Sequence, residues 1–263
     1  MPRQPNGFWG APTSTIDWCE SNYTITPYVA EFFNTVSSLA IVAVAVAGIV
    51  LHIRLLERRF LAAFAAVAVV GAGSAAFHAT LRFGLQMLDE LPMLYSALIM
   101  VYILTERRPK RRFGVWFPWL LCGHGLLITL LTSLTQGPVQ FYSFHISFGT
   151  LELFALVRVF QISRTHAAAK ARGVFWFGMC SYLIGIVVWL VDLRYCHLVS
   201  IILPQNGIPY LELHSVWHVL VALGFYHLLV FLAYDRLVIL GELPKLTRTP
   251  LGLVKVTAGG TPC

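Results

Sequence analysis

The chain has 263 residues, of which 57% are hydrophobic and only 12% are charged. A soluble domain carries about 25% charged residues, so this composition excludes an ordinary water-soluble globule. The formal net charge of +7 does not indicate a nucleic-acid partner, because the charges gather in short clusters between long apolar blocks.

Seven apolar blocks are each long enough to cross about 30 Å of hydrocarbon. They predict an all-α integral membrane protein built as a seven-helix transmembrane bundle. The third block is the least apolar, because it opens with Asp89 and Glu90 and contains Pro92. The connections are short, so neighbouring helices should pack antiparallel. The blocks cover residues 34–53, 60–79, 88–105, 113–134, 139–161, 174–193 and 210–234.

The segments outside the blocks divide the chain into three parts. Residues 1–33 are polar and lack the apolar core of a secretory signal peptide. Residues 34–234 hold the seven spans, and residues 235–263 form a tail. From Gly241 onward the tail carries Pro, Gly and Thr, and we expect it to be mobile.

The positive charges set the expected orientation. Fifteen of the 19 Lys and Arg residues lie in the connections after spans one, three and five and in the C-terminal segment. Because Lys and Arg concentrate on the cytosolic side of a membrane protein, we place the N-terminus in the lumen or outside and the C-terminus in the cytosol. Termini on opposite sides also require an odd number of spans.

Five polar residues lie at similar depth within three of the predicted spans. Ser74 and His78 are four residues apart near the luminal end of span two, and Asp89 lies at the luminal start of span three. His214 and His218 occupy the first turns of span seven. Ionisable groups inside a membrane are costly and face the bundle interior, so their convergence at one depth predicts a functional site.

The residue types at this site favour a metal ion. Two histidines at i and i+4 share one helix face, so His214 and His218 can hold one ion with a third ligand from another helix. Three His ligands and a water form a catalytic zinc arrangement. In H-E-x-x-H proteases the residue after the first His is the glutamate base. Here that residue is Ser215, so Asp89 is the nearest carboxylate candidate for the base.

A structural reading stays open for every intramembrane histidine, in which each ring nitrogen is bonded to the backbone or to another side chain. Buried packing of this kind is the expectation for four other polar residues in or near the spans, which are His145, Glu152, Asp192 and His227.

Three separated segments resemble one known family. They are "STIDWCESNYTITPYVAEFFNTVS" at 14–37, "GSAAFHATLRFGLQMLDELPM" at 73–93 and "HSVWHVLVALGFY" at 214–226. Together they are similar to the alkaline ceramidases, which are seven-span zinc amidases of the endoplasmic reticulum and Golgi. The similarity covers nearly the whole chain up to about Tyr234. It implies a multi-pass protein of these membranes.

The resemblance assigns roles to the five polar residues. The zinc ligands of the family fall on His78, His214 and His218, and its catalytic serine and aspartate fall on Ser74 and Asp89. The implied reaction is hydrolysis of the amide bond of ceramide to a sphingoid base and a free fatty acid. The expected partners are a ceramide-type lipid and the bilayer, with no obligate protein partner.

The N-terminal segment carries hard oxygen ligands of the type that calcium prefers. Its spacing fails the EF-hand pattern, so the residues alone indicate a solvated loop. The resemblance implies a calcium site here, structural or regulatory, that falls on Asp17, the Trp18 carbonyl, Glu20, Asn22 and Glu31.

The five cysteines form no C-x-x-C pair, so cysteine-bound zinc is not expected. Cys19 and Cys196 both map to the luminal side, where an oxidising compartment permits a disulfide. The resemblance implies that these two are paired. Cys122 and Cys180 lie inside spans four and six, and we expect them to be reduced packing residues.

Three other functions are alternatives to ceramide hydrolysis. A non-enzymatic seven-helix receptor with a structural zinc fits the same spans, and so does a different lipid hydrolase or receptor of the adiponectin-receptor type. A retinal protein is disfavoured because it needs a lysine within a span, whereas all four lysines lie in loops or in the tail.

Overall fold

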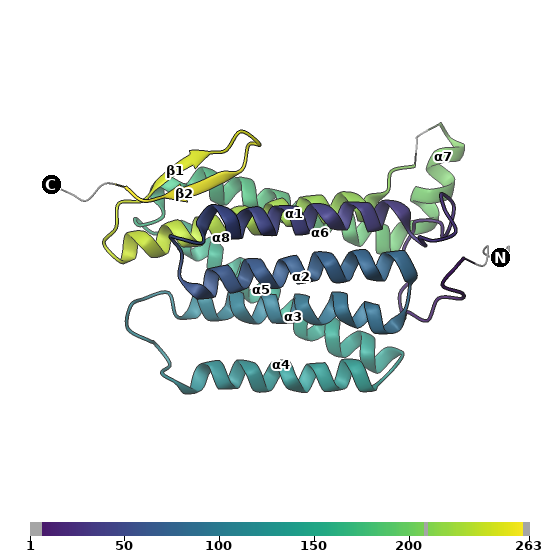
Figure 1. Cartoon of the computed structure of the whole chain (residues 1–263), viewed down its shortest axis with the longest axis horizontal. Helices are drawn as coiled ribbons and strands as arrows, with labels where there is room; N and C mark the ends of the chain where they lie inside the picture. Colours follow the sequence, from purple (N-terminus) through teal and green to yellow (C-terminus); the bar gives the residue numbers. More distant parts are fainter. Residues whose placement is uncertain (1–6, 208–209, 260–263) are drawn as a thin grey trace.

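A computed structural model describes residues 7–207 and 210–259 of the chain. Within this part, seven helices are long and apolar enough to cross a membrane, and they run roughly parallel to one another in a bundle (Figure 1). These helices are α1 Phe32–His52, α2 Arg58–Thr80, α3 Phe83–Thr105, α4 Trp116–Leu134, α5 Pro138–Ser163, α6 Arg172–His197 and α8 Leu213–Ile239. The seven-span all-α prediction is therefore confirmed.

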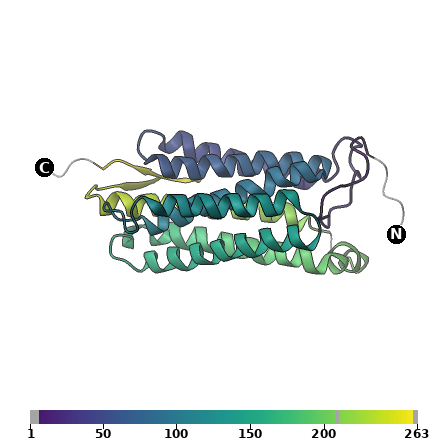
Figure 2. The same ribbon diagram turned by 90° about the horizontal axis from the view of Figure 1, so that it is seen from below.

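Shorter elements join or extend these helices. A 3-10 turn at Ala169–Ala171 precedes α6, and a π-helical turn at Leu198–Ile202 leads from α6 into the short helix α7, Leu203–Gln205. The two ends of the described chain lie at opposite ends of the bundle (Figures 1 and 2). This placement agrees with the odd number of spans.

Several helices are longer than their apolar blocks. Helix α3 begins at Phe83 instead of 88, and α6 continues to His197 instead of 193. The additional turn of α3 contains Gln86, whose fully buried amide donates to the Glu90 carboxyl at 2.7 Å. Because polar side chains in this turn are hydrogen-bonded inside the protein, a helix can continue past the limit that hydropathy sets.

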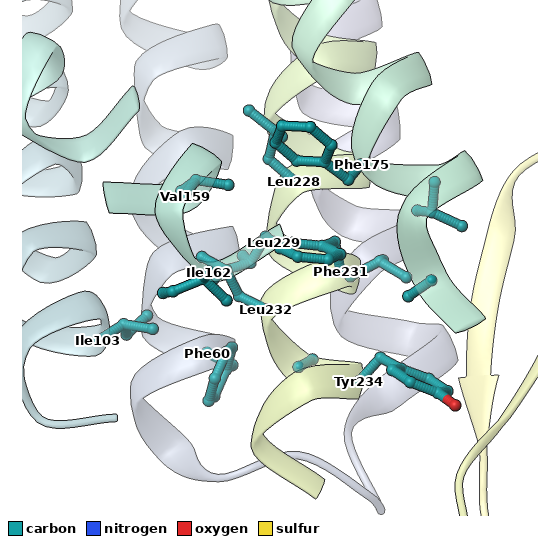
Figure 3. Close-up of a cluster of buried hydrophobic side chains, with 14 of the residues drawn as sticks. Phe60, Ile103, Val159, Ile162, Phe175, Leu228, Leu229, Phe231, Leu232 and Tyr234 are labelled. Carbon is teal, nitrogen blue, oxygen red and sulfur yellow. The ribbon is translucent and has the colours of Figure 1, made fainter. Parts of the chain in front are cut away.

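Helix α8 is the centre of the packing. Fourteen of its residues are buried. Phe231 and Leu229 belong to a buried cluster that also contains Phe60 of α2, Ile162 of α5 and Phe175 of α6 (Figure 3). The outer surface is equally apolar. The side chains of Trp119 and Leu134 on α4 are both 77% exposed, which suits a surface covered by lipid.

Glycines allow the closest helix contacts. At Gly73 on α2, an added Cβ would collide with the backbone carbonyl of Leu88 on α3. The residues that follow these two positions are Ser74 and Asp89, so this contact sets the distance between the two helices at the predicted site. Small residues that let backbones approach are typical of membrane helix pairs.

Replacing Gly73 with alanine is expected to destabilise the protein by about 1–3 kcal/mol, the usual cost of overpacking. Thermal unfolding of the purified protein in detergent measures this change. The matched control is Gly123→Ala on α4, where an added Cβ meets no atom within 4 Å and alanine is the better helix former. Equal melting temperatures for the two variants would contradict the proposed contact.

The C-terminal segment differs from its prediction. Helix α8 continues five residues past 234 to Ile239, and strands β1 Lys245–Arg248 and β2 Val254–Thr257 form an antiparallel hairpin. The expected mobile tail is therefore wrong for residues 245–257, while residues 1–6 and 260–263 lie outside the described chain. Two hydrogen bonds dock the hairpin: Val256 N–H donates to His52 Nε2 at 3.1 Å, and Tyr226 Oη donates to the Val254 carbonyl at 2.9 Å.

Candidate metal centre

The three predicted histidines meet at the end of the bundle where the N-terminal segment lies. His78 belongs to the last turn of α2, and His214 and His218 belong to the first turns of α8. One ligand nitrogen from each ring lies within 4.8 Å of the others. All three side chains are buried, with residual exposures of 0%, 3% and 0%. The geometry is that of a three-histidine site for one metal ion.

Neighbouring groups fix the orientation of each ring. His78 Nδ1 lies 2.5 Å from the Glu31 carboxylate, and His218 Nδ1 lies 2.7 Å from the Ser37 hydroxyl. The His214 ring packs against Trp18 at an interplanar angle of 31°, with 3.9 Å between the ring centroids. Metal-binding histidines commonly have such an outer partner on the nitrogen that does not bind the metal.

The ring nitrogens that lack an outer partner indicate whether the cluster can hold a cation. His78 Nε2 and His214 Nδ1 are buried and have no hydrogen-bond partner within the described part of the chain. An unsatisfied buried nitrogen is costly, and a metal ion at the centre of the cluster would satisfy both. The donor set therefore fits zinc, which prefers nitrogen ligands and four-coordinate sites.

Ser74 and Asp89 lie beside the histidines. Ser74 Oγ is 3.5 Å from His218 Nε2 and 3.1 Å from the Ser38 hydroxyl. Its hydroxyl is also hydrogen-bonded to the Asp89 carboxyl across the contact between α2 and α3. The structure thus brings together all five residues that the sequence placed at one depth.

A cavity of about 360 Å³ opens at this cluster. His214 and Asp89 form part of its wall, and most other wall residues are apolar or aromatic. Two polar groups interrupt the apolar wall farther along the bundle, where the Glu152 carboxyl is hydrogen-bonded to the Tyr182 hydroxyl. The cavity has the character expected for a lipid chain.

Glu31 connects the N-terminal segment with the histidines. Its backbone N–H donates to the His78 carbonyl at 3.0 Å, and the N–H of Ala30 donates to the Ala79 carbonyl at 2.9 Å. These bonds join the segment before α1 to the end of α2 and direct the Glu31 carboxylate at His78. Burial raises the pKa of Glu31 to about 8, and a nearby cation would favour its charged form.

The other residues of the predicted calcium set are only partly together. The Asn22 amide donates to the Asp17 carboxylate at 3.1 Å, and the Trp18 N–H donates to Glu31 at 3.3 Å. Glu20 instead accepts the backbone N–H groups of Phe33 and Asn34 at 2.7 and 2.8 Å. It therefore caps helix α1, although burial raises its pKa to about 7.

The sequence reasoning assigned Glu31 only to calcium, and it missed Ser37. The positions of these residues could have suggested a contact, because Glu31 directly precedes the first span and Ser37 lies in its second turn. Both therefore sit at the same end of the bundle as the histidines.

Substituting Glu31 with glutamine is expected to lower zinc affinity about 10- to 100-fold, the usual effect of removing the partner of a metal-binding histidine. Competition with a zinc chelator during dialysis measures this affinity. Glu20→Gln is the matched control, since the Glu20 carboxylate caps α1 and accepts no histidine hydrogen bond. An unchanged zinc affinity in Glu31→Gln would exclude the orienting role.

A disulfide joins Cys19 to Cys196, with 5.3 Å between the Cα atoms. This is the pairing that the family resemblance implied. Cys196 lies in the last turn of α6 rather than after the span, so the bond fixes the N-terminal segment to the end of that helix. Cys122 and Cys180 are free and exposed on the outer surface. They form no disulfide, as expected for reduced cysteines, but the prediction that they are packing residues is wrong.

The fold and this site define a multi-pass membrane protein with a buried three-histidine centre at a lipid-sized cavity. Residues 10–249 match the Ceramidase family, and the chain belongs to this family. It is 35% identical over 246 residues to alkaline ceramidase 3 of Mus musculus, covering 91% of this chain and 90% of the relative. It is 29% identical over 244 residues to an alkaline ceramidase of Arabidopsis thaliana, with 91% of each chain covered.

Proposed function

We propose that this protein hydrolyses the amide bond of ceramide to give a sphingoid base and a free fatty acid. The observation that carries the proposal is the cluster of three histidines, Ser74 and Asp89 beside a largely apolar cavity, which His214 and Asp89 line. A family relationship with proteins named as alkaline ceramidases supports the same reaction.

We assign the metal to zinc, which His78, His214 and His218 would hold. Bound there, zinc would supply Lewis-acid polarisation of the amide carbonyl and lower the pKa of water towards about 7. Asp89 and His214 both line the cavity, so the cavity would give substrate and water access to a metal ion held by the histidines.

The protein residues move the protons. Asp89 accepts a proton from the attacking water and returns one to the leaving amine, as a general base and then a general acid. Ser74 donates a hydrogen bond to the developing oxyanion and keeps its proton, which requires its hydroxyl to turn from its resting partner Asp89. The apolar cavity holds the aliphatic chains and excludes water from them.

Incubation of the purified protein with ceramide tests the reaction directly. We expect equal amounts of sphingoid base and free fatty acid, measured by mass spectrometry, and loss of both products after zinc removal. A preparation that contains zinc but releases neither product would favour a non-enzymatic receptor with a structural zinc. Release of fatty acid from another lipid class alone would favour a hydrolase of the adiponectin-receptor type.

We also assign a calcium site to the N-terminal segment. Asp17, the Trp18 carbonyl, Glu20, Asn22 and Glu31 provide oxygen ligands of the required kind, and four of these residues, all except Glu20, are already linked by hydrogen bonds within the set. By resemblance to the family, we place the protein in the endoplasmic reticulum or Golgi membrane.

A further inference from the structure

A buried carboxylate, that of Glu90, lies next to Asp89 in α3 and has no role in the reaction above. Glu90 is only 5% exposed, yet it forms part of the wall of the same cavity as Asp89. An acidic side chain inside a membrane helix is rare without a functional reason.

Two glutamine side chains hold this carboxylate in place. Gln86 Nε2 donates to Glu90 Oε1 at 2.7 Å, and Gln140 Nε2 donates to Glu90 Oε2 at 2.8 Å. Both glutamines are fully buried. Thr15 of the N-terminal segment braces them in turn, because its hydroxyl lies 2.7 Å from Gln86 Nε2 and 2.9 Å from Gln140 Oε1.

This arrangement leaves Glu90 able to bind a ligand. A carboxylate has about four acceptor positions, and the glutamines occupy one on each oxygen. The carboxylate is rigidly placed, faces a cavity and retains acceptor capacity. A ligand group that donates a hydrogen bond fits it, whereas an aliphatic chain does not.

The chemistry of ceramide provides such donors at the right place. Its two sphingoid-base hydroxyls are on the carbons next to the one that carries the amide nitrogen. Asp89 and Glu90 are neighbours in α3, and both line the same cavity. A lipid in this cavity whose amide lies at Asp89 therefore has its hydroxyls within the part of the cavity that Glu90 lines.

We propose that Glu90 accepts a hydrogen bond from a hydroxyl of the sphingoid base and so selects ceramides over lipids that lack it. This inference rests on the proposed ceramide hydrolysis. It assigns Glu90 a role in substrate specificity, with Gln86 and Gln140 as its positioning residues.

The test compares three substrates with the same acyl chain: ceramide, its analogue without the C1 hydroxyl and its analogue without the C3 hydroxyl. We expect wild-type kcat/KM to fall about tenfold or more for one analogue, because a polar site rejects a ligand that leaves it unpaired. Equal kcat/KM values for all three substrates would overturn the role of Glu90 while leaving ceramide hydrolysis intact. No hydrolysis of any of the three would overturn both proposals.

The variant Glu90→Gln separates recognition from structure. We expect its preference for ceramide over the affected analogue to fall below about threefold, since a neutral acceptor binds a hydroxyl more weakly than a carboxylate does. Glu242→Gln, an exposed glutamate beyond α8, is the matched control and should retain the wild-type preference. An equal loss of kcat/KM on all three substrates would show that Glu90 only supports the fold. If the variant fails to fold, the kcat/KM values of the wild-type protein on the three substrates decide whether a hydroxyl is recognised.

Discussion

Replacing His78 with alanine is expected to remove bound zinc and ceramide hydrolysis together. His78 is the one ligand that α2 contributes, while both others come from α8. Without His78, only the two ligand nitrogens of α8 remain. A metal ion held by these two alone would no longer link α2 to α8. Since a metal ion contributes several kcal/mol to transition-state stabilisation and each 1.36 kcal/mol is a factor of ten, we expect a loss of about a thousandfold or more.

Zinc per mole of protein, measured by elemental analysis, and fatty acid release are the two measurements. The matched control is His124→Ala. His124 lies on α4 and is hydrogen-bonded to Ser147 at 2.8 Å, away from the three-histidine cluster. It should keep both zinc and turnover. A wild-type protein free of zinc, or a His78→Ala variant with undiminished activity, would overturn the proposed centre.

The position of the site could be predicted because membrane depth follows from the chain. Once the spans are counted and oriented, a residue number gives an approximate depth in the membrane. This depth placed His78, Asp89 and His214 at the same end of the bundle. In the structure, ligand nitrogens of His78 and His214 lie within 4.8 Å of each other, and Asp89 lines the same cavity as His214. Depth alone does not give the rotation of each helix. Only the i, i+4 spacings of Ser74 with His78 and of His214 with His218 gave part of this information in advance.

The contacts made by irregular backbone could not be predicted in the same way. Glu31 reaches His78 through hydrogen bonds between the backbone before α1 and the end of α2, and no periodic pattern marks such a pairing. The C-terminal hairpin is similar. Its composition of Pro, Gly and Thr indicated mobility, whereas its order comes from tertiary contacts of Val254 and Val256 with Tyr226 and His52. The binding network of Glu90 likewise depends on three segments that are distant in sequence.

Changing Asp89 to asparagine is expected to leave zinc in place and to abolish most turnover. Asp89 is outside the histidine cluster and touches it through Ser74, so the three ligands should keep their geometry. An asparagine has nearly the same shape and can still accept a hydrogen bond from Ser74, but it cannot take a proton from water. Loss of a general acid–base catalyst lowers the rate by about 10²- to 10⁴-fold.

The informative result is an unchanged zinc content together with a reduced kcat. We expect Asp89→Asn to contain wild-type zinc and to bind ceramide with nearly unchanged affinity, because a group that acts only on protons contributes to kcat. Ser74→Ala provides the comparison. It should also keep zinc, but it removes one hydrogen bond to the oxyanion, for which losses of about 10²- to 10³-fold are typical. Full activity of Asp89→Asn would exclude Asp89 as the base.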